Sequence, residues 1–343
     1  MIDPTLPLCD LHRHLEGSVR TATILDLGRR HGLPLPARDE AGLTPYVRVT
    51  EPAPGVMAFI ERFHWARQVM ADPDACRRIA LECVEDAHAE GLDYLELRFS
   101  PWFMAEPHGL HPEAVVEAVA DGVAAGARDT GVRASLIGIL SRTYGPDLCR
   151  RELEALLAHR ARIVALDLAG DEARFPAALF EDHFRRAREA GWRVTVHAGE
   201  ADGAASVRES IVRLGAERIG HAVRAADDPS LLDLMADRGI GIECNLTSNV
   251  QTSTVRDYAS HPMRAFLERG LLATLNTDDP SISGIDLAHE YRVAAPAAGL
   301  TPAHIRTAQQ NALRIAFLSD VERAALRARA ARRGAASQAA PDA

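Results

Sequence analysis

The sequence predicts an α/β fold in which eight parallel strands alternate with helices and close into a (β/α)8 TIM barrel. Eight short apolar or β-branched runs are separated by longer amphipathic segments, a pattern typical of parallel strands joined by crossover helices. The unusual polar residues of the chain also fall at the ends of several of these runs. Barrels of this kind carry their chemistry at the carboxyl ends of their strands, so both observations support the same fold.

The predicted strands are short and rich in aliphatic residues. They occupy residues 8–14, 92–100, 133–140, 163–170, 193–200, 218–223, 239–246 and 272–279. Segments with helical periodicity lie between them, at residues 112–130, 176–190, 204–214, 229–237 and 262–268. Repeated strand–helix units of this length predict a parallel sheet that curls until its edges meet.

Two parts of the chain depart from the regular alternation. An insertion of about residues 15–91 follows the first strand and is far longer than one crossover helix requires, so we expect it to be helical and to form a lid. Residues 300–328 have the pattern of closing C-terminal helices. We therefore predict one domain over residues 1–328 and a disordered tail over residues 329–343.

Composition limits the possible functions. The net charge of −9 over 343 residues argues against nucleic acid or an anionic membrane as a partner. No apolar run approaches the ~20 residues of a membrane span, and the first residues lack a signal-peptide pattern, so we expect a cytoplasmic protein. The five cysteines form no C-x-x-C pair, and we expect reduced thiols. The oligomeric state is left open.

The chain contains no lysine, because arginine accounts for all 39 Lys and Arg residues. A Schiff base, a P-loop lysine and a lysine nucleophile are therefore excluded. A carboxylated lysine that bridges two metal ions is excluded for the same reason. Several classes of enzyme mechanism are removed by this single feature of the composition.

Four residues at predicted strand ends are candidate metal ligands. His12 and His14 are two positions apart and therefore project from the same face of the first strand. His197 ends the fifth strand and Asp278 ends the eighth. Three imidazoles and one carboxylate suit zinc and leave a coordination position for water.

Three further residues at strand ends are candidates for proton chemistry. Glu200 follows His197 after a turn at Gly199, and beside a metal it is suited to shuttle a proton. His221 ends the sixth strand and is placed to hold a water molecule. Asp279 is adjacent to Asp278 and precedes a proline, so it can turn toward a substrate while its neighbour binds the metal; a plain turn residue is the alternative.

The chain resembles the adenosine deaminase family of the amidohydrolase superfamily, and the pattern is most similar to that of the bacterial adenosine deaminases. The resemblance covers residues 8 to about 320 in family order. It is carried by the segments DLHRHLEGS (10–18), LDYLELRFSP (92–101), ALDLAGDE (165–172), VTVHAGE (194–200), ERIGHAV (217–223), CNLTSNVQT (244–252) and NTDDP (276–280).

The resemblance implies zinc-dependent hydrolytic deamination of adenosine and 2′-deoxyadenosine in purine salvage, with a purine nucleoside as the small-molecule partner. The implied ligands of one zinc ion per chain are His12, His14, His197 and Asp278. Glu200 is then the proton donor to purine N1, while His221 and Asp279 position the attacking water. The implied substrate contacts are His14, Glu16, Gly170 at N3 and Asp279 at N7.

Two departures from the family pattern concern the substrate. Glu16 stands where the family usually has an aspartate that meets the ribose 5′-hydroxyl. Its longer side chain either still reaches a ribose or fills the ribose space and favours a free base. Ala222 stands where the family usually has glycine, and its methyl group either narrows the pocket or is a neutral packing difference.

Other functions remain as alternatives. One is deamination of adenine, aminodeoxyfutalosine or another 5′-modified adenosine, and another is metal-dependent ester or amide hydrolysis on the same barrel. A zinc-binding protein without catalysis is a third, which the full set of candidate catalytic residues disfavours. The cytidine-type zinc deaminase is rejected, because His14-Leu15-Glu16 matches half of its motif but no C-x-x-C is present.

Overall fold

A computed structural model of the chain describes residues 2–339, with side chains described to residue 335. Eight parallel strands pair in sequence order from β1 to β8. Their bounds are Cys9–His14, Tyr94–Phe99, Arg133–Ser141, Ile163–Ala169, Arg193–Ala198, Arg218–His221, Gly241–Cys244 and Leu272–Leu275. The last and first strands approach each other beyond β8, where Asp278 donates its backbone N–H to His12 and accepts one from His14. The predicted TIM barrel is confirmed.

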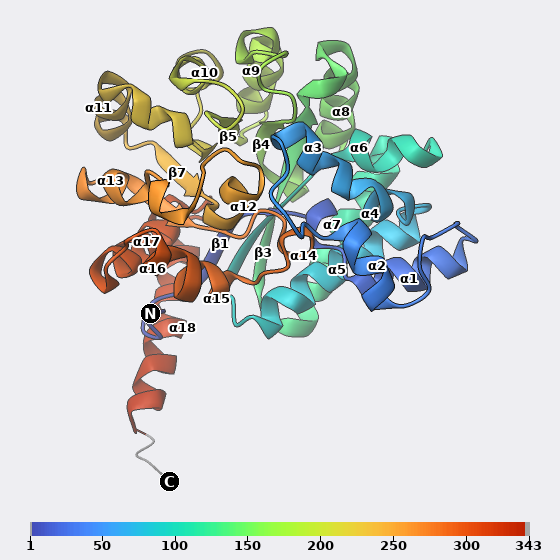
Figure 1. The fold of residues 1–343 in the computed structure, drawn as a ribbon, viewed down its shortest axis with the longest axis horizontal. Coiled ribbons are helices and arrows are strands. Elements are labelled where there is room, and N and C mark those ends of the chain that lie inside the picture. Colours follow the sequence, from blue (N-terminus) through green and yellow to red (C-terminus); the bar gives the residue numbers. More distant parts are fainter. Residues whose placement is uncertain (1, 340–343) are drawn as a thin grey trace.

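Helices surround the barrel on its outer side (Figure 1). Between successive strands from β2 to β8 run α6 (Pro101–Ala105), α7 (Pro112–Thr130), α8 (Pro146–Ala158), α9 (Glu181–Glu189), α10 (Ala204–Glu209), α11 (Pro229–Arg238), α12 (Leu246–Gln251) and α13 (Met263–Glu268). After β8 follow α14 (Pro280–Ser283), α15 (Leu287–His289), α16 (Ala295–Ala297), α17 (Pro302–Ile315) and α18 (Asp320–Ala339). Most of the helical segments expected from periodicity are therefore helices, although several are shorter than expected.

The segment between β1 and β2 contains five α-helices and crosses the mouth of the barrel. They are α1 (Thr21–Arg30), α2 (Glu40–Val47), α3 (Val56–Ile60), α4 (His64–Gln68) and α5 (Pro73–Ala89). The backbone before α3 bonds to the segments that follow β7 and β8, through Ala53 to Gln251 and Val49 to Ile282. Phe59 and Phe63 pack with Ile282 there. In Figure 1, α3 accordingly lies above the strand ends, near α12 and α14.

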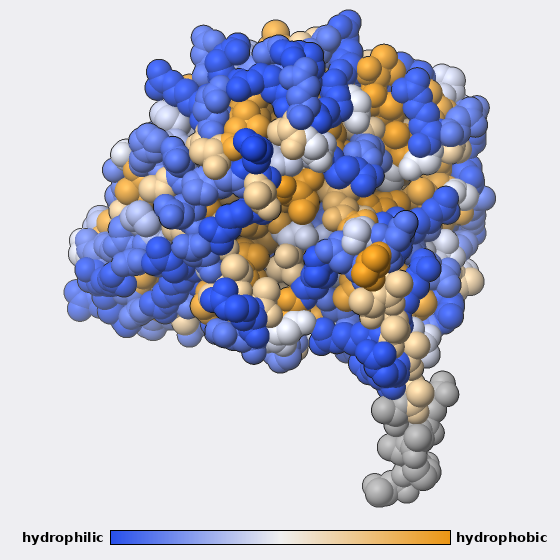
Figure 2. Space-filling model, turned by 180° about the vertical axis from the view of Figure 1, so that it is seen from behind, coloured by the Kyte–Doolittle hydropathy of each residue, from blue (hydrophilic) through white to orange (hydrophobic). Residues whose placement is uncertain are grey.

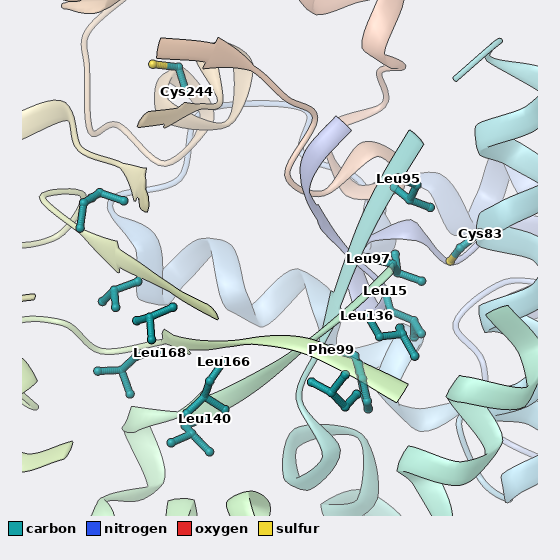
Figure 3. Close-up of a cluster of buried hydrophobic side chains, with 14 of the residues drawn as sticks. Leu15, Cys83, Leu95, Leu97, Phe99, Leu136, Leu140, Leu166, Leu168 and Cys244 are labelled. Carbon is teal, nitrogen blue, oxygen red and sulfur yellow. The ribbon is translucent and has the colours of Figure 1, made fainter. Parts of the chain in front are cut away.

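The strands turn their aliphatic side chains outward and their charged side chains inward. On β2, Leu95, Leu97 and Phe99 point toward the surrounding helices with the aliphatic residues of neighbouring strands (Figure 3). The alternate residues Glu96 and Arg98 are also fully buried, and the two-residue repeat of a strand places them on the opposite face. The apolar core therefore lies between barrel and helices, and the barrel interior is charged.

The C-terminal helix differs from the expected disordered tail. Residues 329–339 continue α18, and residues 340–343 lie outside the described part of the chain. Ala330 is fully buried, and the Arg333 guanidinium donates to the Asp93 carboxylate at 2.8 and 2.9 Å. Arg329 donates to the Gly131 carbonyl at 2.8 Å. The composition of the tail gave no signal of these contacts, which join it to the segments just before β2 and β3.

The face in Figure 2 is largely hydrophilic, with hydrophobic residues mostly in hollows between hydrophilic ridges. All five cysteines are buried and unpaired. Within residues 2–339, no helix combines the length and the apolar character that a membrane crossing requires.

Candidate active site

Four predicted metal ligands converge at the carboxyl ends of the barrel strands. The Nε2 atoms of His12 and His14 on β1 lie 3.0 and 3.2 Å from Nε2 of His197 on β5. Oδ1 of Asp278 lies 3.1 Å from Nε2 of His12 and 3.3 Å from that of His14. Ligands at the usual distances around a tetrahedral zinc ion are separated by about 3.3–3.4 Å. The observed spacing fits one metal ion.

The hydrogen bonds behind two of these imidazoles leave their facing nitrogens suited to hold a cation. Nδ1 of His12 donates to the Glu243 carboxylate at 2.7 Å, and Nδ1 of His197 donates to Asp167 at 3.1 Å. A neutral imidazole that carries its proton on Nδ1 has a bare lone pair on Nε2. Two such lone pairs repel at 3.0 Å unless positive charge lies between them. Imidazoles oriented by carboxylates in this way are usual among zinc ligands.

A buried arginine joins the two carboxylates that orient the imidazoles. Arg98 on β2 donates from Nη1 to Asp167 and from Nη2 to Glu243, each at 2.8 Å. Glu243 also pairs with Arg218 at 2.7 Å. Burial alone would raise the pKa of Glu243, but the guanidinium groups of Arg98 and Arg218 lower it well below its usual range. Both carboxylates therefore remain charged and keep the imidazoles in one tautomer.

His221, at the end of β6, lies beside the ligand cluster. A ring nitrogen of His221 lies within 4.8 Å of ligand atoms from three of the four predicted ligands. Its Nδ1 accepts from the Asn249 amide at 2.9 Å, while Nε2 faces Glu200 at 3.6 Å and Asp278 at 3.7 Å. Burial lowers the pKa of His221 well below its usual value, so the ring is neutral with its proton on Nε2. That N–H can orient a water molecule beside the ligands.

Glu200 lies in the turn after β5, next to His221 and the ligand cluster. Burial raises the pKa of Glu200 well above its usual value, and the charges of Asp278 and Glu172 raise it further against the opposing effect of Arg142. The carboxyl group therefore holds its proton to a higher pH than an exposed glutamate does. A carboxyl group of this kind can act as a general acid toward a ring nitrogen of a substrate.

The two adjacent aspartates lie beyond the end of β8, which is shorter than the predicted strand over residues 272–279. The strand ends at Leu275, and Asp278 has a left-handed backbone with φ of +63°. Such a conformation in a residue other than glycine costs about 1–3 kcal/mol and is concentrated at functional sites. Asp279 is buried, and its Oδ1 has no hydrogen-bond partner among the described residues. A Cβ at Gly17 would meet that oxygen at 1.8 Å, so Gly17 provides the space that Asp279 occupies.

A cavity of about 290 Å³ lies beside the ligand cluster and is lined by three of the four predicted substrate contacts. Its lining includes His14, Glu16 and Gly170. A smaller adjoining cavity of about 70 Å³ shares His14 and Gly170 and is also lined by Glu200 and Asp279. The structure therefore brings the predicted substrate residues to two adjoining cavities, of which the smaller is also lined by the predicted catalytic residues.

Glu16 lines this cavity, and one of its carboxyl oxygens is buried without a hydrogen-bond partner among the described residues. Its Oε1 accepts the backbone N–H of Ser100 at 2.7 Å, whereas the buried Oε2 has no partner among the described residues. Burial raises the pKa of Glu16 to about 7, against the lowering effect of the Ser100 N–H. A buried oxygen without a partner is unfavourable until a donor arrives, so a hydroxyl group of a ligand would fit here.

Gly170 and Ala222 both have a positive backbone φ. Gly170 has φ of +110°, and a Cβ there would meet Oγ1 of Thr143 at 2.4 Å. A glycine is required, and its bare backbone can meet a flat ring at close range. Ala222 has φ of +54° and is fully buried, but its side chain lines neither cavity. Of the two alternatives for Ala222, the structure therefore favours the packing difference.

Several functional residues were not singled out from the sequence. They are Arg98, Asp167, Glu172, Glu243, Asn245 and Asn249, which contact the predicted site residues or lie directly behind them. Some of them had a visible signal. Ionisable residues at alternate positions within aliphatic strands are rarely buried unless they are paired, and Arg98, Asp167 and Glu243 have this pattern.

Comparisons with known proteins agree with this geometry. Residues 7–332 match the family model described as adenosine deaminase. A protein named adenosine deaminase from Erwinia tasmaniensis is 57% identical over 331 residues, covering 96% of this chain and all of the relative. Among solved structures, an adenine deaminase from Arthrobacter aurescens superposes with a TM-score of 0.88 at 27% identity, covering 98% of this chain and all of the other.

An amidohydrolase from Burkholderia ambifaria, solved with bound zinc, superposes with a TM-score of 0.87 at 29% identity. The match covers 99% of this chain and 94% of that protein. Sequence and structure comparisons therefore extend over nearly the whole chain and include the strand ends described above. The chain belongs to the adenosine deaminase family.

Proposed function

We propose that the chain hydrolyses adenosine and 2′-deoxyadenosine to inosine and 2′-deoxyinosine with release of ammonia. The observation that carries the proposal is the ligand cluster of three imidazoles and Asp278 beside the protonated carboxyl group of Glu200. The relatives named adenosine deaminase at 57% identity support the same reaction. As cofactor we propose one zinc ion per chain, held by His12, His14, His197 and Asp278.

The residues of the chain divide the chemistry between them. A zinc ion in this cluster would act as a Lewis acid and make water available as a nucleophile near neutral pH. Nε2 of His221 and the side chain of Asp279 would orient the attacking water toward C6 of the purine. Glu200 donates its proton to N1, so the ring accepts the electron pair without building a full negative charge. The backbone of Gly170 and the side chain of Asp279 hold the purine edge at N3 and N7.

The shape of the cavity supports a nucleoside rather than a free base. One interpretation of Glu16 is that its longer side chain fills the ribose space, but a cavity of about 290 Å³ remains beside it. The free Oε2 of Glu16 is the kind of acceptor that a ribose hydroxyl satisfies. The similarity to an adenine deaminase structure favours adenine as the second candidate. The unpaired cysteines support our further proposal of a reducing, cytoplasmic location.

The proposal is tested by the fall in ultraviolet absorbance that accompanies loss of the purine amino group. Purified enzyme, analysed for metal, is assayed with adenosine, 2′-deoxyadenosine, adenine and a 5′-substituted adenosine. We expect the highest kcat/KM for the two nucleosides, with one ammonia released per inosine formed. Turnover of adenine or of the 5′-substituted compound alone would identify that compound as the substrate in place of adenosine. Inactivity toward all four compounds, with one zinc ion bound per chain, would refute the proposed reaction.

Replacing Glu16 by alanine should weaken binding of the nucleoside without removing the chemistry. Loss of a hydrogen bond to a charged group predicts a KM for adenosine raised by about 10- to 100-fold, with kcat affected less. If the enzyme also turns over adenine, which has no ribose, the KM for adenine should not change. Steady-state kinetics of Glu16→Ala measure both values, and Glu61→Ala, an exposed residue of the same insertion, is the control. An equal change for both substrates would contradict the assigned contact.

A further inference from the structure

The turn that carries Glu200 is held by a single buried carboxylate. Oε2 of Glu172 accepts the backbone N–H groups of Glu200, Ala201 and Asp202 at 3.2, 2.8 and 3.0 Å. Oε1 accepts the N–H of Gly199 at 2.6 Å. Four consecutive amides therefore converge on one side chain, which is the geometry of an anion-binding nest of backbone N–H groups.

Glu172 also connects three elements of the site. It lies two residues after Gly170 in the segment that follows β4, and only 3% of it is exposed. Its Oε1 accepts the Ser206 hydroxyl of α10 at 2.5 Å. The turn itself requires Gly199, whose φ is +71°. The carboxylate thus fixes the turn after β5 relative to the segment whose Gly170 backbone faces the substrate cavity.

Charged groups from the surrounding strands face Glu200. Asp278 approaches from the end of β8 and His221 from the end of β6, while Glu172 lies behind the turn. Arg142, after β3, donates to the carbonyls of Leu168 and His197 at 2.8 and 2.6 Å. Among these groups, Glu172 adds negative charge behind Glu200, and Arg142 opposes it.

We propose that Glu172 is a positioning residue for the reaction: by gathering the amides of residues 199–202, it fixes the carboxyl group of Glu200 relative to the purine. The inference rests on the proposed function for the role of Glu200, but the contact with the turn does not depend on it. Glu172 touches neither the ligand cluster nor the cavities, so it acts only through Glu200 and its turn.

The test compares Glu172→Gln with Glu172→Asp. The glutamine keeps the size of the side chain, but it loses the charge and turns an NH2 group toward amides that are themselves donors. We expect kcat for adenosine to fall at least about 10-fold in Glu172→Gln, with KM within about threefold of the wild type, because orientation of a general acid acts on the chemical step. Glu172→Asp keeps both oxygens and the charge, and it should recover part of the lost kcat.

Asp93→Asn is the matched control, because Asp93 is a buried carboxylate at the opposite end of the barrel that accepts the Leu8 N–H at 2.9 Å. Hydrogen exchange of the amides of residues 199–202 is the second readout, and it should be faster in Glu172→Gln but unchanged in the control. Equal loss of kcat in Glu172→Gln and the control would overturn the proposal, as would unchanged exchange. If the wild-type enzyme is inactive on adenosine, the proposed function is refuted instead. Hydrogen exchange of the amides then still decides whether Glu172 holds the turn.

Discussion

Glu200→Gln should bind metal and substrate as the wild type does and lose nearly all turnover. Glutamine has nearly the same shape, but it cannot release a proton to purine N1. Loss of a general acid typically lowers the rate by about 10²- to 10⁴-fold, and we expect kcat to fall within this range while KM changes little. Single-turnover absorbance measurements on protein with verified metal content give the result.

The pH dependence of the wild type provides an independent check on Glu200. Because burial raises its pKa well above the usual value, the proton-bearing form is present near neutrality and is lost as the pH rises through that raised pKa. The kcat of the wild type should therefore decline on the alkaline side, and the residual rate of Glu200→Gln should lack this decline. Glu82→Gln, a buried glutamate on α5, should behave as the wild type. Full activity in Glu200→Gln would refute the assigned proton transfer.

His197→Ala should lose the metal ion. The substitution removes one of the three imidazoles and leaves Asp167 without the ring that it orients. Removing a hydrogen-bond partner of a ligand typically costs 10- to 100-fold in metal affinity, so loss of the ligand itself should cost more than about 100-fold. Elemental analysis after dialysis against a weak chelator measures the remaining metal, with zinc titration of the apo-protein for the affinity.

Two further variants define the scale of this effect. Asp167→Asn keeps the imidazole of His197 but weakens its orientation, and its affinity should fall between those of the wild type and His197→Ala. His183→Ala removes a buried histidine on α9 whose ring bonds to the Pro146 carbonyl, and it should keep a full complement of metal. Unchanged metal content in His197→Ala would remove this residue from the ligand set.

The fold was predictable because its signals are local. Each strand is a short aliphatic run, and each change to helical periodicity lies within a few residues of a boundary. The strand ends were less predictable where the backbone becomes irregular. The eighth strand was expected to run to Asp279 but ends at Leu275, because Asp278 turns into a left-handed conformation to reach the ligand cluster. Periodicity contains no information about such a turn.

The convergence of the site residues followed from their residue types and their places at strand ends, whereas the groups that orient them did not. Glu172 acts on backbone amides, which have no side-chain signature in a sequence. The free oxygen of Glu16 depends on how one rotamer lies against the Ser100 backbone, so the sequence left the ribose question open. The helical course of residues 329–339 depends on contacts with Asp93, more than 230 positions earlier in the chain.

The charged interior of the barrel has a consequence for how the protein unfolds. Arg98 joins carboxylates on β4 and β7, and Arg218 on β6 pairs with Glu96 on β2 as well as with Glu243. Strands from opposite sides of the barrel are thus tied through buried charges. A half-open barrel would leave some of these charges buried without a partner, which costs several kcal/mol for each ion pair broken on one side only. Intermediates with part of the barrel detached are therefore disfavoured, and the catalytic centre should disappear in the same cooperative transition as the barrel itself.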